Sequence, residues 1–400
     1  MRLPSYPVMA LAALAAAAGV ACGSAASTYE ELLATIPDTR ETRMGVFIHD
    51  YALVRQLFDI PLPGPEDGED AMEEFLPHIP PLERWGETYP AMYEPWLFGP
   101  FSRDRLSMTS EHFRYLGFDY RNMDQSIVTY LGSSQPAHLY QVIRGRFGPQ
   151  ATDKALASCS ECEPPRREEH RGISYYSWGA DYAIDEGSSF APPAFDRLGR
   201  GGRIAVLDEY LFRTVGTSEM KGLIDAHHDE APSLADAEEF RLLSKGMSQL
   251  GAYAMFLSDD ASFFELDEQI HALLLDGGAE VSESEMERLL AELGPPLRPY
   301  AAYATGAGKD EEGGYMALAL LHSDDVLPEE NVGLLRRRIE EGTSIGNLVP
   351  GNLVPWSELI DVDTLEIQAE GPLLLAKLRG FAPLWMTWVD QRDTLITYEE

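Results

Sequence analysis

The apolar positions along this chain recur with two different spacings, which predict short strands and short helices. Alternation of apolar and polar residues indicates a strand, whereas a spacing of three or four residues indicates a helix. Strands are predicted at residues 45–49, 139–146, 173–178, 203–207, 210–214, 251–257, 298–305, 315–322, 365–370, 373–378, 384–389 and 394–398. Helical spacing is found at residues 29–36, 53–58, 110–116, 149–158, 218–226, 232–245, 283–293 and 328–341.

The order of these elements predicts an α+β fold. A strand–helix–strand unit at residues 139–178 suits a mixed or antiparallel sheet with helices packed on one face. The same order of elements returns in the C-terminal part of the chain. We therefore expect two similar halves, at residues 37–276 and 283–400, preceded by a tether and first helix at residues 22–36.

Residues 61–100 are rich in proline, acidic residues and aromatic residues, which predicts a long ordered loop. Trp85, Tyr89, Tyr93, Trp96 and Phe98 supply more apolar area than a plain linker carries. We expect these rings to cover the core. The alternative is a groove that binds a sugar or a peptide.

The start of the chain has the pattern of an export signal. Residues 7–21 are uncharged, rich in alanine and leucine, preceded by Arg2 and too short for a comfortable bilayer span, which predicts a signal peptide at residues 1–21. The following Gly19-Val20-Ala21-Cys22 resembles the bacterial lipobox, although Gly19 stands where leucine is usual. This resemblance implies lipidation of Cys22 and attachment to the cell membrane or outer membrane on the extracytoplasmic side. The alternative is cleavage near Ser24 and release of a free protein.

The charge balance restricts the range of partners. The chain has 66 Asp and Glu against 31 Lys and Arg, a formal net charge of −35. Nucleic acid is excluded as a partner because its binding requires clustered cations, and the dense basic runs at residues 166–167 and 336–338 are short. We expect both runs to be solvated. Because this charge repels anionic membranes, membrane residence would depend on the lipid anchor.

If Cys22 is acylated, the remaining two cysteines, Cys159 and Cys162, form a C-x-x-C pair. An exported compartment favours a disulfide between them, which closes a small loop and stabilises the chain locally by about 2 kcal/mol at most. Redox chemistry would need the pair at a helix N-terminus, whereas here it ends a helical run and has acidic neighbours. The pair could instead stay as free thiols, or bind a metal together with His170.

Two short motifs match enzyme patterns without the context that those enzymes need. Residues 342–346 read G-x-S-x-G, but a helix precedes them where a nucleophile elbow requires a strand. Ser218 and Lys221 fit S-x-x-K, but no K-T-G sequence accompanies them, and Ser218 is expected to cap a helix. Gly308-Lys309 lacks the other residues of a phosphate-binding loop. The sequence therefore identifies no catalytic residues.

Metal sites are equally weakly indicated. His227-His228-Asp229-Glu230 is dense in potential ligands, but adjacent histidines point in different directions on a helix. We expect these histidines to lie at a helix C-terminus for electrostatic reasons. Asp361, Asp363 and the segment 309–314 lack the ordered spacing of a calcium loop. We expect no metal and no cofactor.

The segment from about 200 to 260 resembles a module of a family of uncharacterised exported bacterial proteins, often lipoproteins. Its hairpin, helix, Ser233-Leu234-Ala235-Asp236, second helix and strand follow in the order found there. The phrases at residues 37–43 and 144–147 are also similar to phrases in such lipoproteins. The resemblance implies an exported location and an α+β fold, without an activity.

These observations favour a membrane-tethered extracytoplasmic lipoprotein that binds an envelope protein or a glycan and acts as a scaffold, without enzymatic activity. The alternatives are an envelope hydrolase that uses two carboxylates, and a protein that captures a metal or small ligand. The sequence does not determine the oligomeric state.

Overall fold

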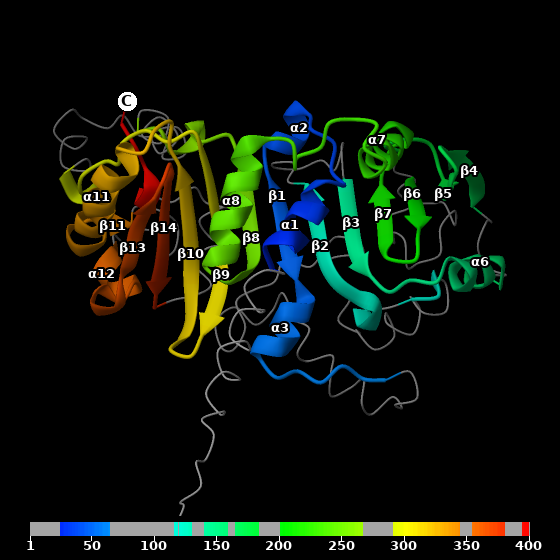
Figure 1. The fold of residues 1–400 in the computed structure, drawn as a ribbon, viewed down its shortest axis with the longest axis horizontal. Coiled ribbons are helices and arrows are strands. Elements are labelled where there is room, and N and C mark those ends of the chain that lie inside the picture. Colours follow the sequence, from blue (N-terminus) through cyan, green and yellow to red (C-terminus); the bar gives the residue numbers. More distant parts are fainter. Residues whose placement is uncertain are drawn as a thin grey trace, which may run out of the picture.

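The computed structural model describes residues 25–64, 116–118, 120–129, 140–158, 165–183, 201–266, 291–344, 354–380 and 394–399. Within these residues one large sheet runs across the molecule, with every neighbouring pair of strands antiparallel (Figure 1). The expected α+β class with an antiparallel sheet is confirmed.

The strands lie in an order that differs from their order along the chain. From one edge to the other they are β13 (Glu366–Glu370), β14 (Leu373–Arg379), β10 (Gly313–Leu321), β9 (Ala302–Asp310), β8 (Ala252–Ser258), β1 (Val46–Asp50), β2 (Met123–Thr129), β3 (Tyr140–Gly145), β7 (Tyr210–Thr214), β6 (Gly202–Val206), β5 (Ile173–Trp178) and β4 (Arg166–His170). A separate short ribbon pairs β11 (Thr343–Ser344) with β12 (Val354–Pro355). The first strand of the chain therefore lies in the middle of the sheet.

Helices cover both faces of the sheet, whereas one covered face was expected. One face carries α1 (Ala25–Leu33), α7 (Thr217–His227) and α8 (Glu238–Gln249); the other carries α3 (Tyr51–Leu57), α6 (Pro149–Ser158), α11 (Leu327–Glu341) and α12 (Trp356–Leu359). Along β14, Leu375 belongs to the core cluster of α8, whereas Leu374 belongs to that of α11. The reason is that the central strands are apolar on both sides: all seven residues of β8 are buried.

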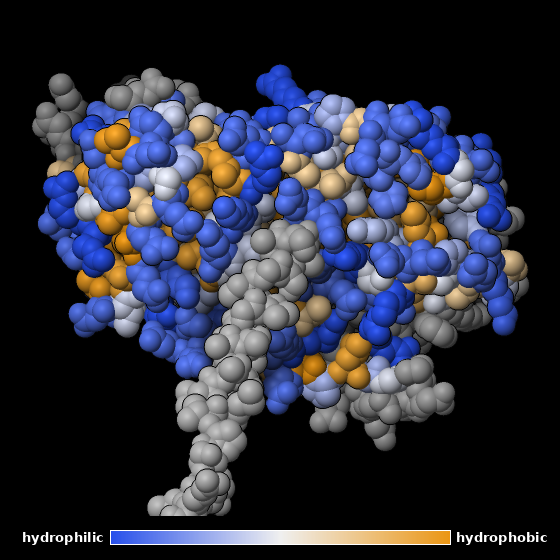
Figure 2. Space-filling view, in the orientation of Figure 1, coloured by the Kyte–Doolittle hydropathy of each residue, from blue (hydrophilic) through white to orange (hydrophobic). Residues whose placement is uncertain are grey.

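Short elements join these layers. The helix α2 (Arg40–Arg43) links α1 to β1, and four single turns of 3-10 helix are η3 (Tyr120–Asn122), η4 (Ser262–Phe264), η5 (Val362–Thr364) and η6 (Thr394–Ile396). No helix of the described residues is long and apolar enough to cross a membrane. Hydrophilic residues cover most of the face shown in Figure 2.

Several predicted elements are confirmed within a residue or two, and others are wrong. The helix at 149–158 and the strands at 173–178 and 210–214 lie where expected. The strand expected at 394–398 is instead the turn η6, after which Tyr398 makes isolated bridges to Glu265 and Leu297. The strands β2 and β4 were not predicted.

The hairpin of β9 and β10 is longer than expected, because it includes most of the glycine-rich acidic segment between the predicted strands at 298–305 and 315–322. The strands extend to Asp310 and from Gly313, so that only Glu311 and Glu312 form the turn. A Cβ atom on Gly306 would overlap the Ala254 carbonyl oxygen on the neighbouring strand. The glycines therefore allow close packing inside the sheet.

The two expected halves contribute to the same sheet. β8 of the first half pairs directly with β9 of the second, from Ala252 opposite Gly308 to Ser258 opposite Tyr303. The expected junction at residues 276–282 lies outside the described residues. The helices expected at 110–116 and 283–293, the loop at 61–100 and the strand at 384–389 lie wholly or mostly outside them as well.

Candidate functional site

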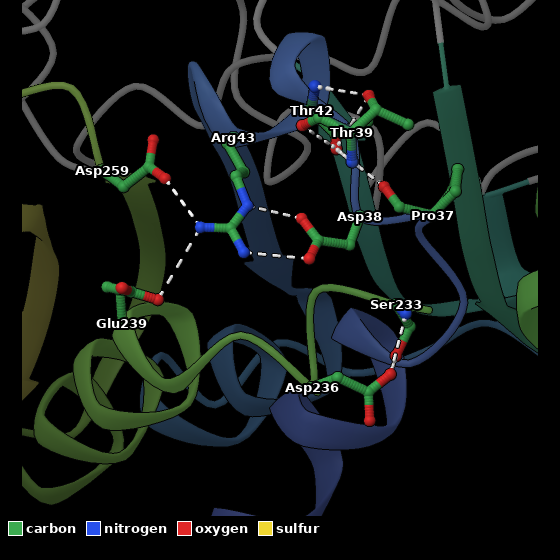
Figure 3. A network of polar contacts seen from close by, with 9 residues as sticks. All are labelled: Pro37, Asp38, Thr39, Thr42, Arg43, Ser233, Asp236, Glu239 and Asp259. Atoms are coloured by element: carbon green, nitrogen blue, oxygen red, sulfur yellow. Dashed lines mark hydrogen bonds and ion pairs between the residues drawn. The ribbon is translucent and has the colours of Figure 1, made fainter. Parts of the chain in front are cut away.

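Two segments that the sequence resemblance singled out meet at one end of the sheet (Figure 3). The Asp38 N–H donates to the Pro232 carbonyl oxygen at 2.9 Å, and the Leu234 N–H donates to the Ile36 carbonyl oxygen at 2.9 Å. Pro37 and Ser233 form an isolated antiparallel bridge between these bonds. Residues 37–43 and 233–236 are thus a single structural unit. We call these residues, together with Glu239 and Asp259, the Arg43 clamp.

Each half of the clamp is shaped by its own local hydrogen bonds. Thr39 caps α2: the Thr42 N–H donates to Thr39 Oγ1 at 3.2 Å, and the Thr39 N–H donates to Thr42 Oγ1 at 3.0 Å. In the second half, the Ser233 N–H donates to Asp236 Oδ2 at 2.8 Å. Because residues 233–236 form this turn, the following helix begins at Glu238 and not at residue 232 as expected.

The guanidinium of Arg43 lies at the centre of the clamp. It donates to both oxygens of Asp38, at 2.5 and 2.9 Å, and to Asp259 Oδ2 at 3.1 Å. The Glu239 carboxylate lies 3.8 Å from the same guanidinium. One positive charge therefore faces three carboxylates, which gives a local balance of +1 − 3 = −2.

The electrostatics of the clamp follow from these bonds. Hydrogen bonding to Asp38 raises the pKa of Arg43 above its ordinary value. Burial raises the pKa of Asp259, and the hydrogen bond from Arg43 opposes that rise. A bidentate guanidinium–carboxylate pair fixes direction as well as distance. The arrangement is suited to holding two segments together.

The clamp also fixes the chain on either side of it. The Asp259 N–H donates to the Arg43 carbonyl oxygen at 3.3 Å, and Ser258 Oγ donates to the Met44 carbonyl oxygen at 2.8 Å. Further back, the Tyr29 hydroxyl donates to the Ala252 carbonyl oxygen at 2.8 Å. Residues 29–44 are therefore fastened to both ends of β8.

Residues 144–147, the third segment that carries the sequence resemblance, lie apart from the clamp. They contact α1, the helix that Tyr29 joins to β8. Arg144 Nη1 lies 2.6 Å from Glu31 Oε2 on α1. A Cβ atom on Gly145 would overlap the Asn122 carbonyl oxygen, so this position needs glycine. The Phe147 N–H donates to the Asp208 carbonyl oxygen at 2.9 Å, beside the turn between β6 and β7.

The described residues do not include the cysteines predicted to be lipidated or oxidised. Cys22, Cys159 and Cys162 lie outside the described residues, as do Trp85 and Trp96. Lipidation and the disulfide therefore stay predictions.

Both enzyme-like motifs have structural roles within the described residues. Gly216, not Ser218, is the N-cap of α7, and Ser218 Oγ instead donates to Glu219 Oε2 at 2.9 Å. The helix begins one residue earlier than expected, which moves Ser218 into its first turn. Ser344 is 1% exposed in the short strand β11, beyond the end of α11, so its hydroxyl does not face solvent.

Among the described residues, His227 and His170 have structural contacts. His227 lies 5.3 Å from the rings of both Tyr210 and Phe212, and burial lowers its pKa. His170 Nε2 lies 2.8 Å from Asp225 Oδ1. Within the described residues no group of three or more His, Cys, Asp or Glu side chains could hold a metal ion.

His49 and Arg338 are among the buried polar residues that the sequence did not reveal. His49 on β1 is 1% exposed, neither ring nitrogen has a hydrogen-bond partner among the described residues, and burial lowers its pKa to about 4. Arg338 is 0% exposed and donates to the Thr397 carbonyl oxygen at 2.6 Å. The run 336–338 is therefore not wholly solvated as expected, because helical spacing turns its third arginine into the core.

Comparison with known proteins adds little to this picture. No family model matches the chain, and no curated protein matches it. Among solved structures, the chain is similar to TP0453 in crystal form III (TM-score 0.36, 10% identity, 89% of this chain and 96% of that chain). It is likewise similar to crystal form I (0.36, 9%, 89% and 95%) and crystal form IV (0.36, 10%, 88% and 94%). Similarity at this level extends to neither a family nor a function.

Proposed function

We propose that this protein is a lipid-tethered extracytoplasmic scaffold that binds an envelope protein or a glycan. The observation that carries the proposal is the Arg43 clamp, which fastens the segment following Cys22 to the folded body. Arg43 joins residues 38 and 259, and Tyr29 joins α1 to β8. A scaffold requires a fixed relation between its anchor and its body, and the clamp supplies that relation.

The length of the tether supports the proposal. Cys22 precedes Ala25, the first residue of α1, by three residues, which span at most about 10 Å even when fully extended. Because α1 is held by Arg144 and Tyr29, an acylated Cys22 would keep the sheet close to the membrane surface. The body would then present its remaining surface in a restricted set of orientations.

The charge of the chain is consistent with attachment by acyl chains. A net charge of −35 opposes adsorption to anionic lipids. Two or more acyl chains, at about 0.8 kcal/mol per buried methylene, hold a protein on a bilayer stably, whereas one chain does not. The proposal therefore depends on Cys22.

Native mass spectrometry of the full chain, extracted in detergent from its own membrane fraction, tests the proposal. We expect a species that begins at Cys22 and carries two or three acyl chains. The matched variant Cys22→Ala should lose both the acyl mass and the membrane fraction. A wild-type species that begins after Ser24 and carries no acyl group would overturn the proposal. In that case, cross-linking on intact membranes should also find no partner bound to a membrane-anchored form of the protein.

A further inference from the structure

The strand β4 ends the sheet at one side of the molecule (Figure 1) and has an unusual composition for a strand. Its five residues are Arg166, Arg167, Glu168, Glu169 and His170. The side chain of Arg167 is 61% exposed, and Arg166 and Glu169 are exposed as well. No described strand lies beyond β4, so one row of its backbone groups faces outward.

The turn that follows β4 determines which backbone groups these are. His170 pairs with Ile173 across a two-residue turn in which Arg171 and Gly172 have φ values of 50° and 81°. Positive φ at both positions is the geometry of a type I′ hairpin, whose closing pair is hydrogen-bonded. Hydrogen-bonded pairs alternate along an antiparallel ladder, so residues 166, 168 and 170 bond to β5. The N–H and C=O groups of Arg167 and Glu169 therefore point away from the sheet.

We propose that β4 pairs antiparallel with β4 of a second copy of this chain, with the two-fold axis at Glu168. In this register Arg167 faces Glu169 of the second copy, and the same pair recurs on the other side of the axis. The outward backbone groups belong to these same residues, so each facing pair exchanges both of its hydrogen bonds. Opposite charges directly across strands stabilise the pairing.

Other symmetric registers are less favourable. Facing side chains must point to the same side of the sheet, so the axis can lie on a residue but not between two residues. An axis at Arg167 would bring two arginines together and place Pro165, which has no N–H, at a hydrogen-bonding position. An axis at Glu169 would bring two glutamates together and would also place Arg167 opposite Arg171. The axis at Glu168 likewise brings two glutamates together, but it places opposite charges in both flanking pairs. The order Arg-Glu-Glu thus selects one register.

The carboxylate of the residue on the axis already has hydrogen-bond partners in its own chain. Glu168 accepts hydrogen bonds from the Tyr175 hydroxyl at 2.9 Å and from Ser177 Oγ at 2.6 Å, both on β5. These bonds hold the carboxylate over its own sheet. Arg166 of the second copy would lie diagonally across on the same face. The like charges at the axis are therefore flanked by cations.

Charge reversal at the two outward residues tests the proposal with the full chain in detergent, with a reductant present. Light scattering after size exclusion should show a concentration-dependent dimer for the wild type. Arg167→Glu places Glu opposite Glu169, and Glu169→Arg places Arg opposite Arg167, so each variant alone should be monomeric. Both residues are exposed, and thermal unfolding should show that both variants fold.

Mixing the two variants gives the decisive result. In a dimer of one Arg167→Glu chain and one Glu169→Arg chain, both facing pairs again have opposite charges. A tag on one variant should therefore retain the other, whereas neither retains itself. Arg337→Glu makes the same charge change on α11, away from β4, and should stay dimeric. Wild type that is monomeric up to about 1 mM, single variants that remain dimeric, or a mixture that does not associate would each overturn the proposal.

Discussion

At the scale of single residues, Arg43 is the side chain whose loss should matter most for the clamp. Arg43→Met would leave Asp38, Asp259 and Glu239 close together without their cation. We expect the free energy of unfolding to fall by about 1–2 kcal/mol, measured by urea unfolding at neutral pH. The figure is modest because the side chain of Arg43 is 32% exposed.

Arg298 provides the matched control for this prediction. It pairs with Glu330 at 2.9 Å, but both side chains are about half exposed. Arg298→Met should therefore cost well under about 1 kcal/mol. Equal losses for the two substitutions would show that the Arg43 clamp is an ordinary surface ion pair, without a special role in fixing α1 and α2.

His49 should make the stability of the protein depend on pH. Its pKa is about 4 in the folded state and about 6.5 in the unfolded chain, because burial disfavours the charged ring. The unfolded chain therefore binds more protons between these values. The contribution of His49 is fully present above about pH 6.5 and is lost as the pH falls to about 4, a change of about 3 kcal/mol.

His49→Leu tests this prediction because it removes the titrating group and keeps an apolar side chain in the buried position. Urea unfolding between pH 4 and pH 7 should show a flatter dependence for the variant than for the wild type. Gln141→Leu, at a buried position without a titrating group, should leave the wild-type slope unchanged. Identical slopes for all three proteins would rule out His49 as a source of acid sensitivity.

The clamp shows which residue-scale features can be predicted from sequence. Thr39 with Thr42 is a capping pattern, and Ser233 with Asp236 is a turn pattern; both are local and visible in the sequence. The bond from Arg43 to Asp259 joins residues separated by 216 positions, and no local pattern indicates it. The burial of Arg338 could likewise not be predicted from the sequence, because its two arginine neighbours indicated a solvated run.

At the scale of elements, prediction succeeded where a strand or helix has its own apolar period. The strand at residues 173–178 and the helix at 149–158 were confirmed for this reason. β4 was missed because all five of its residues are charged or histidine, which is compatible only with a sheet edge that has little apolar surface to bury. The prediction of a strand at 394–398 is wrong. Apolar alternation indicates which residues are buried, but it does not show that a neighbouring strand is available for pairing.

At the scale of the whole molecule, the pairing of β8 with β9 joins the two halves of the chain. Because both strands are buried and central, separating the halves would expose apolar surface on both faces of the sheet. We therefore expect residues on either side of this pair to unfold together. Hydrogen exchange of β3 and of β14, followed at increasing urea concentration, should lose protection at the same concentration.

Gly306→Ala tests this coupling at the pair itself. The added Cβ would overlap the Ala254 carbonyl oxygen and approach Met247 Cε at 2.8 Å, so β8 and β9 would have to separate slightly. We expect a loss of about 1–3 kcal/mol that lowers the protection of β3 and β14 equally. Gly333→Ala on α11, where an added Cβ meets nothing within 4 Å, should cause no loss. Protection that falls in β14 but not in β3 would show that the halves unfold separately. The continuous sheet would then join two units of independent stability.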